Sequence, residues 1–106
     1  MTKYMVHGTY TAAGLAGVLK DGGTGRAAAV KSLAESVGGS VESIYWAFGA
    51  EDFYITVVMP DAKAAAAVAL TVGASGAVRV ATSELMSVAD LDEAVARKVN
   101  YRPPGS

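Results

Sequence analysis

The first residues alternate between apolar and polar side chains with a period of two, the pattern of a β-strand with two unlike faces. One set of positions falls on one face and the second set on the opposite face: Tyr4, Val6, Gly8 and Tyr10, then Met5, His7 and Thr9. The alternation predicts a strand over residues 3–11.

Two stretches with apolar residues at helical spacing follow, and glycines separate them. Thr11 is a suitable N-cap for the first stretch, which ends at Asp21-Gly22-Gly23. Thr24 can cap the second stretch, which ends at Gly38-Gly39. The apolar positions of the second stretch are Ala27, Val30, Leu33, Ala34 and Val37. We predict one helical crossover made of these two parts.

Two runs rich in β-branched and aromatic residues, 40–48 and 52–59, flank Gly49-Ala50-Glu51 and predict a hairpin. We expect an apolar side with the cross-strand pairs Phe48 with Phe53, Trp46 with Ile55, and Ile44 with Val57. The opposite side then carries Ser43, Tyr45, Tyr54, Thr56 and Val58. Trp46, on the apolar side, is interpreted as a core residue.

Pro60-Asp61 ends this hairpin and caps an alanine-rich helix that runs through Gly73. A fourth strand is predicted over residues 77–85. Its two faces carry Val78, Val80 and Thr82, and Arg79, Ala81 and Ser83.

The last part of the chain predicts a helix and a tail. Ser87 and Asp90 have the spacing of a capping box. The helix that they begin has an apolar stripe at Leu91, Val95 and Val99, with Arg97 and Lys98 at its end. Residues 100–106 contain Pro103-Pro104 and are expected to form an extended tail.

The predicted order, β-α-β-β-α-β with a terminal helix, is the ferredoxin-like arrangement, an α+β fold with both crossover helices on one face of an antiparallel sheet. No repeat or linker divides the chain, so residues 1–106 are expected to form a single domain. The other face of the sheet is then open, and it is too apolar and aromatic to remain in water. We therefore expect a homo-oligomer, a dimer or larger, that packs through the open sheet face.

Several short motifs along the chain resemble those of one family. They are Tyr10-Thr11 with Gly14, Arg26, Tyr45-Trp46-Ala47-Phe48-Gly49-Ala50-Glu51-Asp52, Pro60-Asp61, Ala74-Ser75-Gly76-Ala77-Val78-Arg79 and Tyr101-Arg102-Pro103-Pro104-Gly105. In this order they resemble the GYD domain family of small bacterial and archaeal proteins, over essentially the whole chain. The resemblance implies a dimeric α+β barrel with no agreed biochemical activity. In the family's Gly-x-Tyr-Asp motif, the chain keeps Gly49 and Asp52 but has Glu51 in place of the tyrosine.

Composition excludes several classes of function. A chain of 106 residues that is 52% hydrophobic and 18% charged folds into a domain rather than remaining disordered. Its net charge of -1 and nine scattered basic residues argue against nucleic-acid binding. With no cysteine and one histidine, the chain has no disulfide, no thiolate nucleophile, no cysteine-ligated metal site and no multi-histidine metal site of its own. A metal between the His7 side chains of two copies would need further ligands that the open face lacks.

No membrane partner and no secretion signal are expected. The most apolar stretch, residues 62–72, is interrupted by Lys63 and is much shorter than the roughly 20 residues that span a bilayer. The first residues enter a strand pattern directly, without the apolar region of a signal peptide. A cytoplasmic location is therefore expected.

The open face also carries the candidate chemistry. We expect His7, Tyr45, Tyr54 and Arg79 to project from it, together with Thr9 and Thr56. An imidazole, two phenols and a cation over an apolar floor could bind a small anionic or aromatic ligand. The alternative is that these residues are interface residues whose polar ends find partners across a symmetry axis. No cofactor is expected under either interpretation.

Two other motifs are interpreted as structural. Residues 23–28 match the dinucleotide pattern Gly-x-Gly-x-x-Ala, but a helix rather than a strand precedes them, so Arg26 is expected to form a surface ion pair. Asp52, beside the hairpin turn, is expected to hydrogen-bond local backbone rather than to form a catalytic pair with Glu51. The chain has no Walker loop and no His-Glu-x-x-His stretch.

Two functions remain open from the sequence. The first is a homo-oligomeric ligand-binding or structural module of the GYD type. The second is a cofactor-independent enzyme for a small aromatic or anionic substrate, with His7 as acid/base, Tyr45 or Tyr54 as hydrogen-bond donor and Arg79 as anion clamp.

Overall fold

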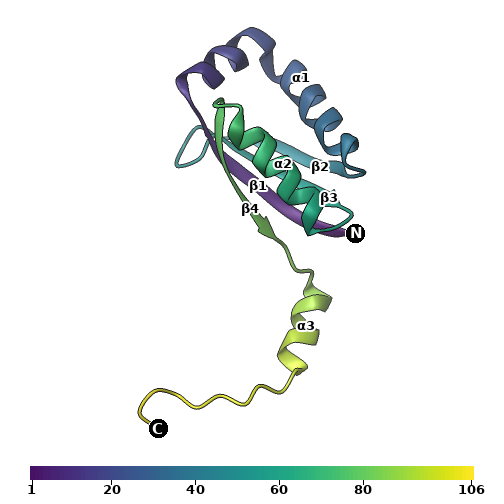
Figure 1. Cartoon of the computed structure of the whole chain (residues 1–106), viewed down its shortest axis with the longest axis vertical. Helices are drawn as coiled ribbons and strands as arrows, with labels where there is room; N and C mark the ends of the chain where they lie inside the picture. The colour runs from purple at the N-terminus through teal and green to yellow at the C-terminus, as the bar shows by residue number, and fades with distance from the viewer.

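The computed structural model describes residues 1–106 and has the predicted element order (Figure 1). The elements are β1 (Thr2–Tyr10), α1 (Ala12–Ser36), β2 (Ser40–Trp46), β3 (Phe53–Met59), α2 (Ala62–Ala74), β4 (Val78–Glu84) and α3 (Val88–Ala96). The strands form one sheet in the order β2-β3-β1-β4, and every neighbouring pair is antiparallel. This is the ferredoxin-like α+β fold with an extra C-terminal helix.

The crossover α1 consists of two helical parts, as predicted. Thr11 is the N-cap, and its hydroxyl accepts a hydrogen bond from the Gly14 N–H at 3.2 Å. Gly22 alone interrupts the helix, with φ 69° and ψ 178°, a conformation that a residue with a Cβ rarely adopts. The helix resumes directly after Gly22, so Thr24 lies within α1 and is not the N-cap of a separate helix.

The hairpin register differs from the predicted one by two residues. Trp46, rather than Phe48, lies opposite Phe53, because β2 ends at Trp46 and the Ala47 N–H donates to the Asp52 carbonyl at 3.1 Å. Phe48 lies in the resulting loop with a left-handed backbone, φ 55°. A shift of two residues leaves the side chains within the strands on their expected faces. Phe48, which was expected on the apolar side, is instead an exposed loop residue.

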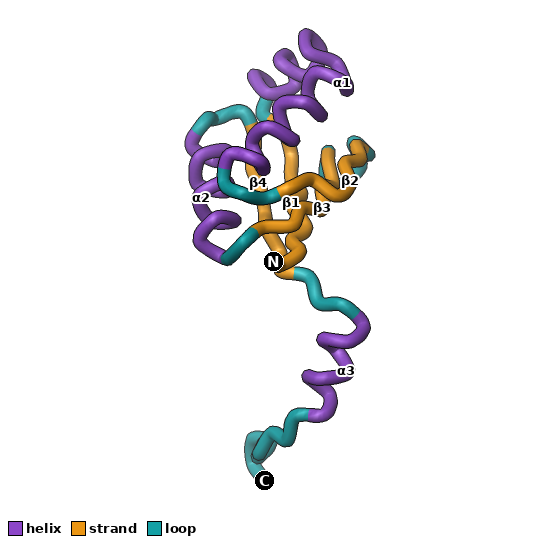
Figure 2. Tube along the Cα trace, turned by 90° about the vertical axis from the view of Figure 1, so that its right-hand side faces the viewer, coloured by secondary structure: helices purple, strands orange, loops and turns teal.

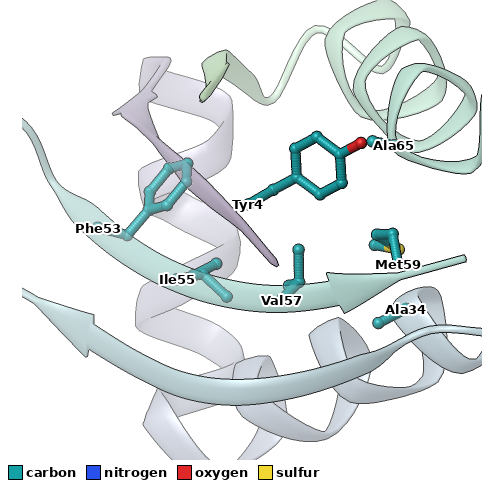
Figure 3. Close-up of a cluster of buried hydrophobic side chains, with 7 residues drawn as sticks. All are labelled: Tyr4, Ala34, Phe53, Ile55, Val57, Met59 and Ala65. Carbon is teal, nitrogen blue, oxygen red and sulfur yellow. The ribbon is translucent and has the colours of Figure 1, made fainter. Parts of the chain in front are cut away.

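The core lies between the sheet and the two crossover helices (Figure 3). Its buried residues are Tyr4, Phe53, Ile55, Val57 and Met59 from the sheet, Ala34 from α1 and Ala65 from α2. Trp46 packs against this cluster, and its Nε1–H donates to the Tyr10 hydroxyl at 3.0 Å. Trp46 is only partly buried, so it lies at the edge of the core rather than within it.

The start of α1 is joined closely to the turn before β4. The Thr11 N–H donates to the Ala77 carbonyl at 2.9 Å, and the Thr11 hydroxyl donates to the Gly76 carbonyl at 2.8 Å. A Cβ added at Gly14 would lie 2.0 Å from the Ala77 carbonyl oxygen. Only glycine fits at residue 14 with this backbone contact in place.

The last helix, α3, begins with the predicted capping box: the Ser87 hydroxyl accepts from the Asp90 N–H, and the Asp90 carboxylate accepts from the Ser87 N–H. These bonds, the one from the Ser87 backbone above all, hold the pKa of the Asp90 carboxyl below its ordinary value. The helix ends at Ala96, because Arg97 is already extended. The prediction that placed Val99 on its apolar stripe is therefore wrong, and Val88, Leu91 and Val95 share one side.

Residues 86–106, which we call the C-terminal arm, project away from the rest of the chain (Figures 1 and 2). Every residue of the arm is exposed, and its last part contains no helix or strand, as predicted for residues 100–106. The radius of gyration is 16.9 Å, whereas a compact chain of this length has about 13 Å. The long axis of the molecule, 57 Å, is set by this arm.

Candidate functional site

The open face of the sheet brings most of the candidate residues into one row across the four strands. Tyr45 lies opposite Tyr54, Tyr54 opposite His7, and His7 opposite Ala81. Because neighbouring strands are about 4.8 Å apart, these side chains are direct neighbours. The histidine lies near the centre of the row, with aromatic residues on one side and a small residue on the other.

The other three candidates lie one step along the strands from this row. Thr9 lies opposite Arg79 at one end, and Thr56 lies between Met5 and Ser43 toward the other. The Thr56 hydroxyl is already bonded to the Ser43 hydroxyl at 2.5 Å. The strands therefore place all six candidates on one face, with Arg79 and Thr56 on opposite sides of His7.

His7 has a partner that the sequence did not indicate. Its Nδ1 lies 2.7 Å from Glu51 Oε1, and both side chains are half-buried. An ionised carboxylate only accepts hydrogen bonds, so Nδ1 carries the proton and donates it to Glu51. In the neutral ring Nε2 is then left as an unshared acceptor. In the resemblance noted above, Glu51 stands where the motif has a tyrosine, and this departure was the only feature of the sequence that set residue 51 apart.

A second contact fixes the ring of His7. It stacks on Tyr54, with ring centroids 6.3 Å apart and an angle of 13° between the planes. The hydroxyls of Tyr45 and Tyr54 have no hydrogen-bond partner in the chain, and Arg79 has no carboxylate partner. The face thus presents an oriented imidazole, two phenol hydroxyls and a guanidinium whose polar groups are free to bind another molecule.

Asp52, next to Glu51 in the sequence, has a structural role. Its carboxylate accepts from the Tyr10 N–H at 2.8 Å, and its own N–H donates to the Gly8 carbonyl at 2.8 Å. The expected bond to local backbone is therefore wrong, because the backbone group that Asp52 binds belongs to β1. Asp52 and Glu51 thus have separate partners and do not act as a carboxylate pair.

Residues 23–28 lie inside α1, so the dinucleotide pattern has no strand before it. Arg26 forms the expected ion pair, with its guanidinium 3.8 Å from the Asp21 carboxylate. No group of three or more histidine, cysteine or acidic side chains is placed to hold a metal ion. None of the helices has both the length and the apolar character that crossing a bilayer requires.

An apolar cavity lies on the other side of the sheet from His7. It has a volume of about 80 Å³ and lies between the sheet, α1 and α2. A second hollow lies where β1 and β4 meet the arm, near Lys3, Met86 and Asp90. Neither of these two hollows includes His7.

The chain thus belongs to the class of ferredoxin-like α+β proteins, with α1 and α2 on one face of a four-stranded sheet and the His7–Glu51 pair on the other side. The GYD domain model matches residues 4–95. The chain belongs to the GYD domain family. No curated protein and no solved structure matches it.

The His7–Glu51 pair predicts the tautomer of the imidazole. At about pH 9, well above the ordinary imidazole pKa, we expect the Nδ1–H form to dominate, and Glu51→Ala to shift the ring toward the Nε2–H form. Two-bond ¹H–¹⁵N correlation spectra of His7 distinguish the two forms. Glu42→Ala is the control, because Glu42 pairs with Lys3 at 2.8 Å and should leave His7 unchanged. A native ring mainly in the Nε2–H form would contradict this prediction.

Proposed function

We propose that the protein is a homodimeric binding module whose site is the open sheet face, closed by the same face of a second copy. The observation that carries the proposal is the His7–Glu51 pair, with 2.7 Å between Nδ1 and Oε1. It lies on a face that also carries two tyrosine rings and the unpaired guanidinium of Arg79. A ligand with an aromatic ring and an anionic group fits this set, since Tyr54 offers a ring and Arg79 a cation.

The composition of the face supports a second copy as its cover. Tyr45 is 69% exposed and lies beside Tyr54, and Met5 lies beside Thr56 on the same face. Packed sheets lie about 10 Å apart, so large side chains touch while small ones leave space. Ala81 and Ser83 occupy the β4 side of this face. Space for a small ligand would thus be left beside His7 rather than beside Tyr45.

Native mass spectrometry of protein purified gently from a cell extract tests the proposal. We expect a dimer that carries additional non-covalent mass, which the denatured sample lacks. A dimer without added mass would favour a purely structural interface, in which the tyrosines and His7 pair across the symmetry axis. A monomer at micromolar concentration would contradict the shared site.

A cofactor-independent enzyme is the second candidate, and one observation favours it. Glu51 and Tyr54 together fix the ring of His7 and leave Nε2 as a proton acceptor. In this function, Nε2 removes a proton from a bound substrate and returns it to another atom of the same molecule, so no redox partner is needed. Arg79 would hold an anionic group of that substrate.

This candidate predicts proton exchange at the bound molecule. If the molecule recovered by native mass spectrometry is incubated in D₂O with the protein, we expect one of its C–H positions to take up deuterium. His7→Gln should lower that rate by about 100-fold or more, the usual size of a general-base effect, while the dimer persists. Equal deuterium uptake with native protein and with His7→Gln would contradict the enzyme candidate, and binding would remain as the only proposed function.

A further inference from the structure

The C-terminal arm carries an amphipathic helix whose apolar side is uncovered. Val88, Leu91 and Val95 share that side of α3 and are 82%, 54% and 77% exposed. The other side is polar and includes Asp90 and Glu93. A stripe at spacings of three and four residues is the pattern of a helix that packs against a surface.

This helix cannot be stable without such a surface. It has nine residues, and isolated helices shorter than about 12–15 residues are marginal in water even with good sequences. Its capping box satisfies backbone groups only at the start. A well-formed α3 therefore requires packing from outside the arm.

The rest of the same chain does not supply this packing. The last backbone link to the sheet is the Leu85 N–H to the Lys3 carbonyl, at 2.9 Å. Beyond it, the hydrogen bonds of the arm are all internal, and none of the three ion pairs includes an arm residue. In both views α3 lies beyond the end of the sheet and away from α1 and α2 (Figures 1 and 2).

The opposite end of the same sheet has an uncovered apolar residue of its own. Phe48, in the loop between β2 and β3, is 56% exposed and has a left-handed backbone. The loop adjoins Gly8 near the end of β1, through the Asp52 N–H, whereas the arm leaves beside Tyr4, near its start. The molecule thus carries two unpartnered apolar features at opposite ends of one sheet.

We propose that the two copies of the dimer exchange their arms, with α3 of each copy packing its apolar stripe on the Phe48 loop of the other. A second copy that covers the open face with its strands running the opposite way lays β4 over β4 and puts the arm of one copy at the same end of the assembly as the Phe48 loop of the other. To reach that loop, α3 crosses the end of the other sheet from its β4 side to its β2–β3 side. Two equal contacts related by a two-fold axis then close the assembly. The arm adds no net charge, since Asp90, Asp92 and Glu93 balance Arg97, Lys98 and Arg102. This inference rests on the dimer of the proposed function.

Three variants test the exchange, with the dimer dissociation constant measured by sedimentation equilibrium. Leu91→Glu places a charge on the stripe, and Ala89→Glu places the same charge on the same helix away from it. Phe48→Asn removes the ring and keeps a residue that tolerates a left-handed backbone. We expect Leu91→Glu and Phe48→Asn each to weaken the dimer about tenfold, and Ala89→Glu to change it less than twofold. The double variant should be little weaker than either single one, because both remove the same contact.

Cross-linking supplies an independent measurement, since the chain has no cysteine of its own. In a mixture of Ala50→Cys and Ala94→Cys chains, oxidation should join the two different variants and leave each variant alone largely unjoined. A native chain that stays monomeric would overturn both the dimer and the exchange. A dimer that Leu91→Glu does not weaken, or additive effects of Leu91→Glu and Phe48→Asn, would overturn the exchange and leave the proposed function standing.

Discussion

Gly14→Ala is expected to lower the free energy of unfolding by about 2–4 kcal/mol, a loss typical of forced overpacking. The new Cβ would lie 2.0 Å from the Ala77 carbonyl oxygen, which is backbone and cannot rotate away. That carbonyl also accepts from the Thr11 N–H. Any shift that relieves the clash therefore breaks the junction between the start of α1 and the turn before β4.

Gly17→Ala is the matched control for this prediction. Gly17 lies in the same part of α1, and a Cβ there would meet nothing within 4 Å. Alanine in a helix interior is favoured over glycine by about 0.5–1 kcal/mol, so this variant should be slightly more stable than the native chain. Urea unfolding followed by circular dichroism measures both variants. Equal stability of the two would show that α1 does not approach Ala77 so closely.

Tyr45→Glu is expected to dissociate the proposed dimer. A glutamate at residue 45 would be buried between the two sheets without a partner, which should raise the dissociation constant by about 100-fold, or roughly 2.7 kcal/mol. Sedimentation equilibrium measures the shift, and circular dichroism checks that each monomer remains folded.

Leu70→Glu provides the comparison for Tyr45→Glu. Leu70 is an exposed apolar residue on α2, on the helix-covered side of the sheet. The same charge there should leave the dimer intact. If the dimers of Tyr45→Glu and Leu70→Glu had the same dissociation constant, the open face would not be the interface.

The faces of the sheet were predictable from the sequence because side chains alternate along each strand and the apolar set of each strand faces the helices. His7, Tyr54 and Arg79 share a face for this reason, and no knowledge of loops was needed. The hairpin register was not predictable in the same way. It depends on where β2 ends, and the bond between Ala47 and Asp52 makes the loop longer than Gly49-Ala50-Glu51 suggests.

The chemistry of the site was predictable only in part. The His7–Glu51 contact joins residues 44 positions apart, and no periodicity relates a strand residue to a loop residue. The arm shows the same limit. Ser87 and Asp90 predict the start of α3 because capping is local. The separation of α3 from the sheet depends instead on whether the rest of the domain has a surface on which α3 can pack.

The position of β1 in the sheet has a consequence for synthesis on the ribosome. As the first strand made, β1 lies between β3 and β4, and its bonds to β4 extend as far as Glu84. Until that residue has emerged, one edge of the nascent sheet remains unpaired and open to other chains. The four-stranded sheet can thus be completed only after every residue as far as Glu84 has left the ribosome.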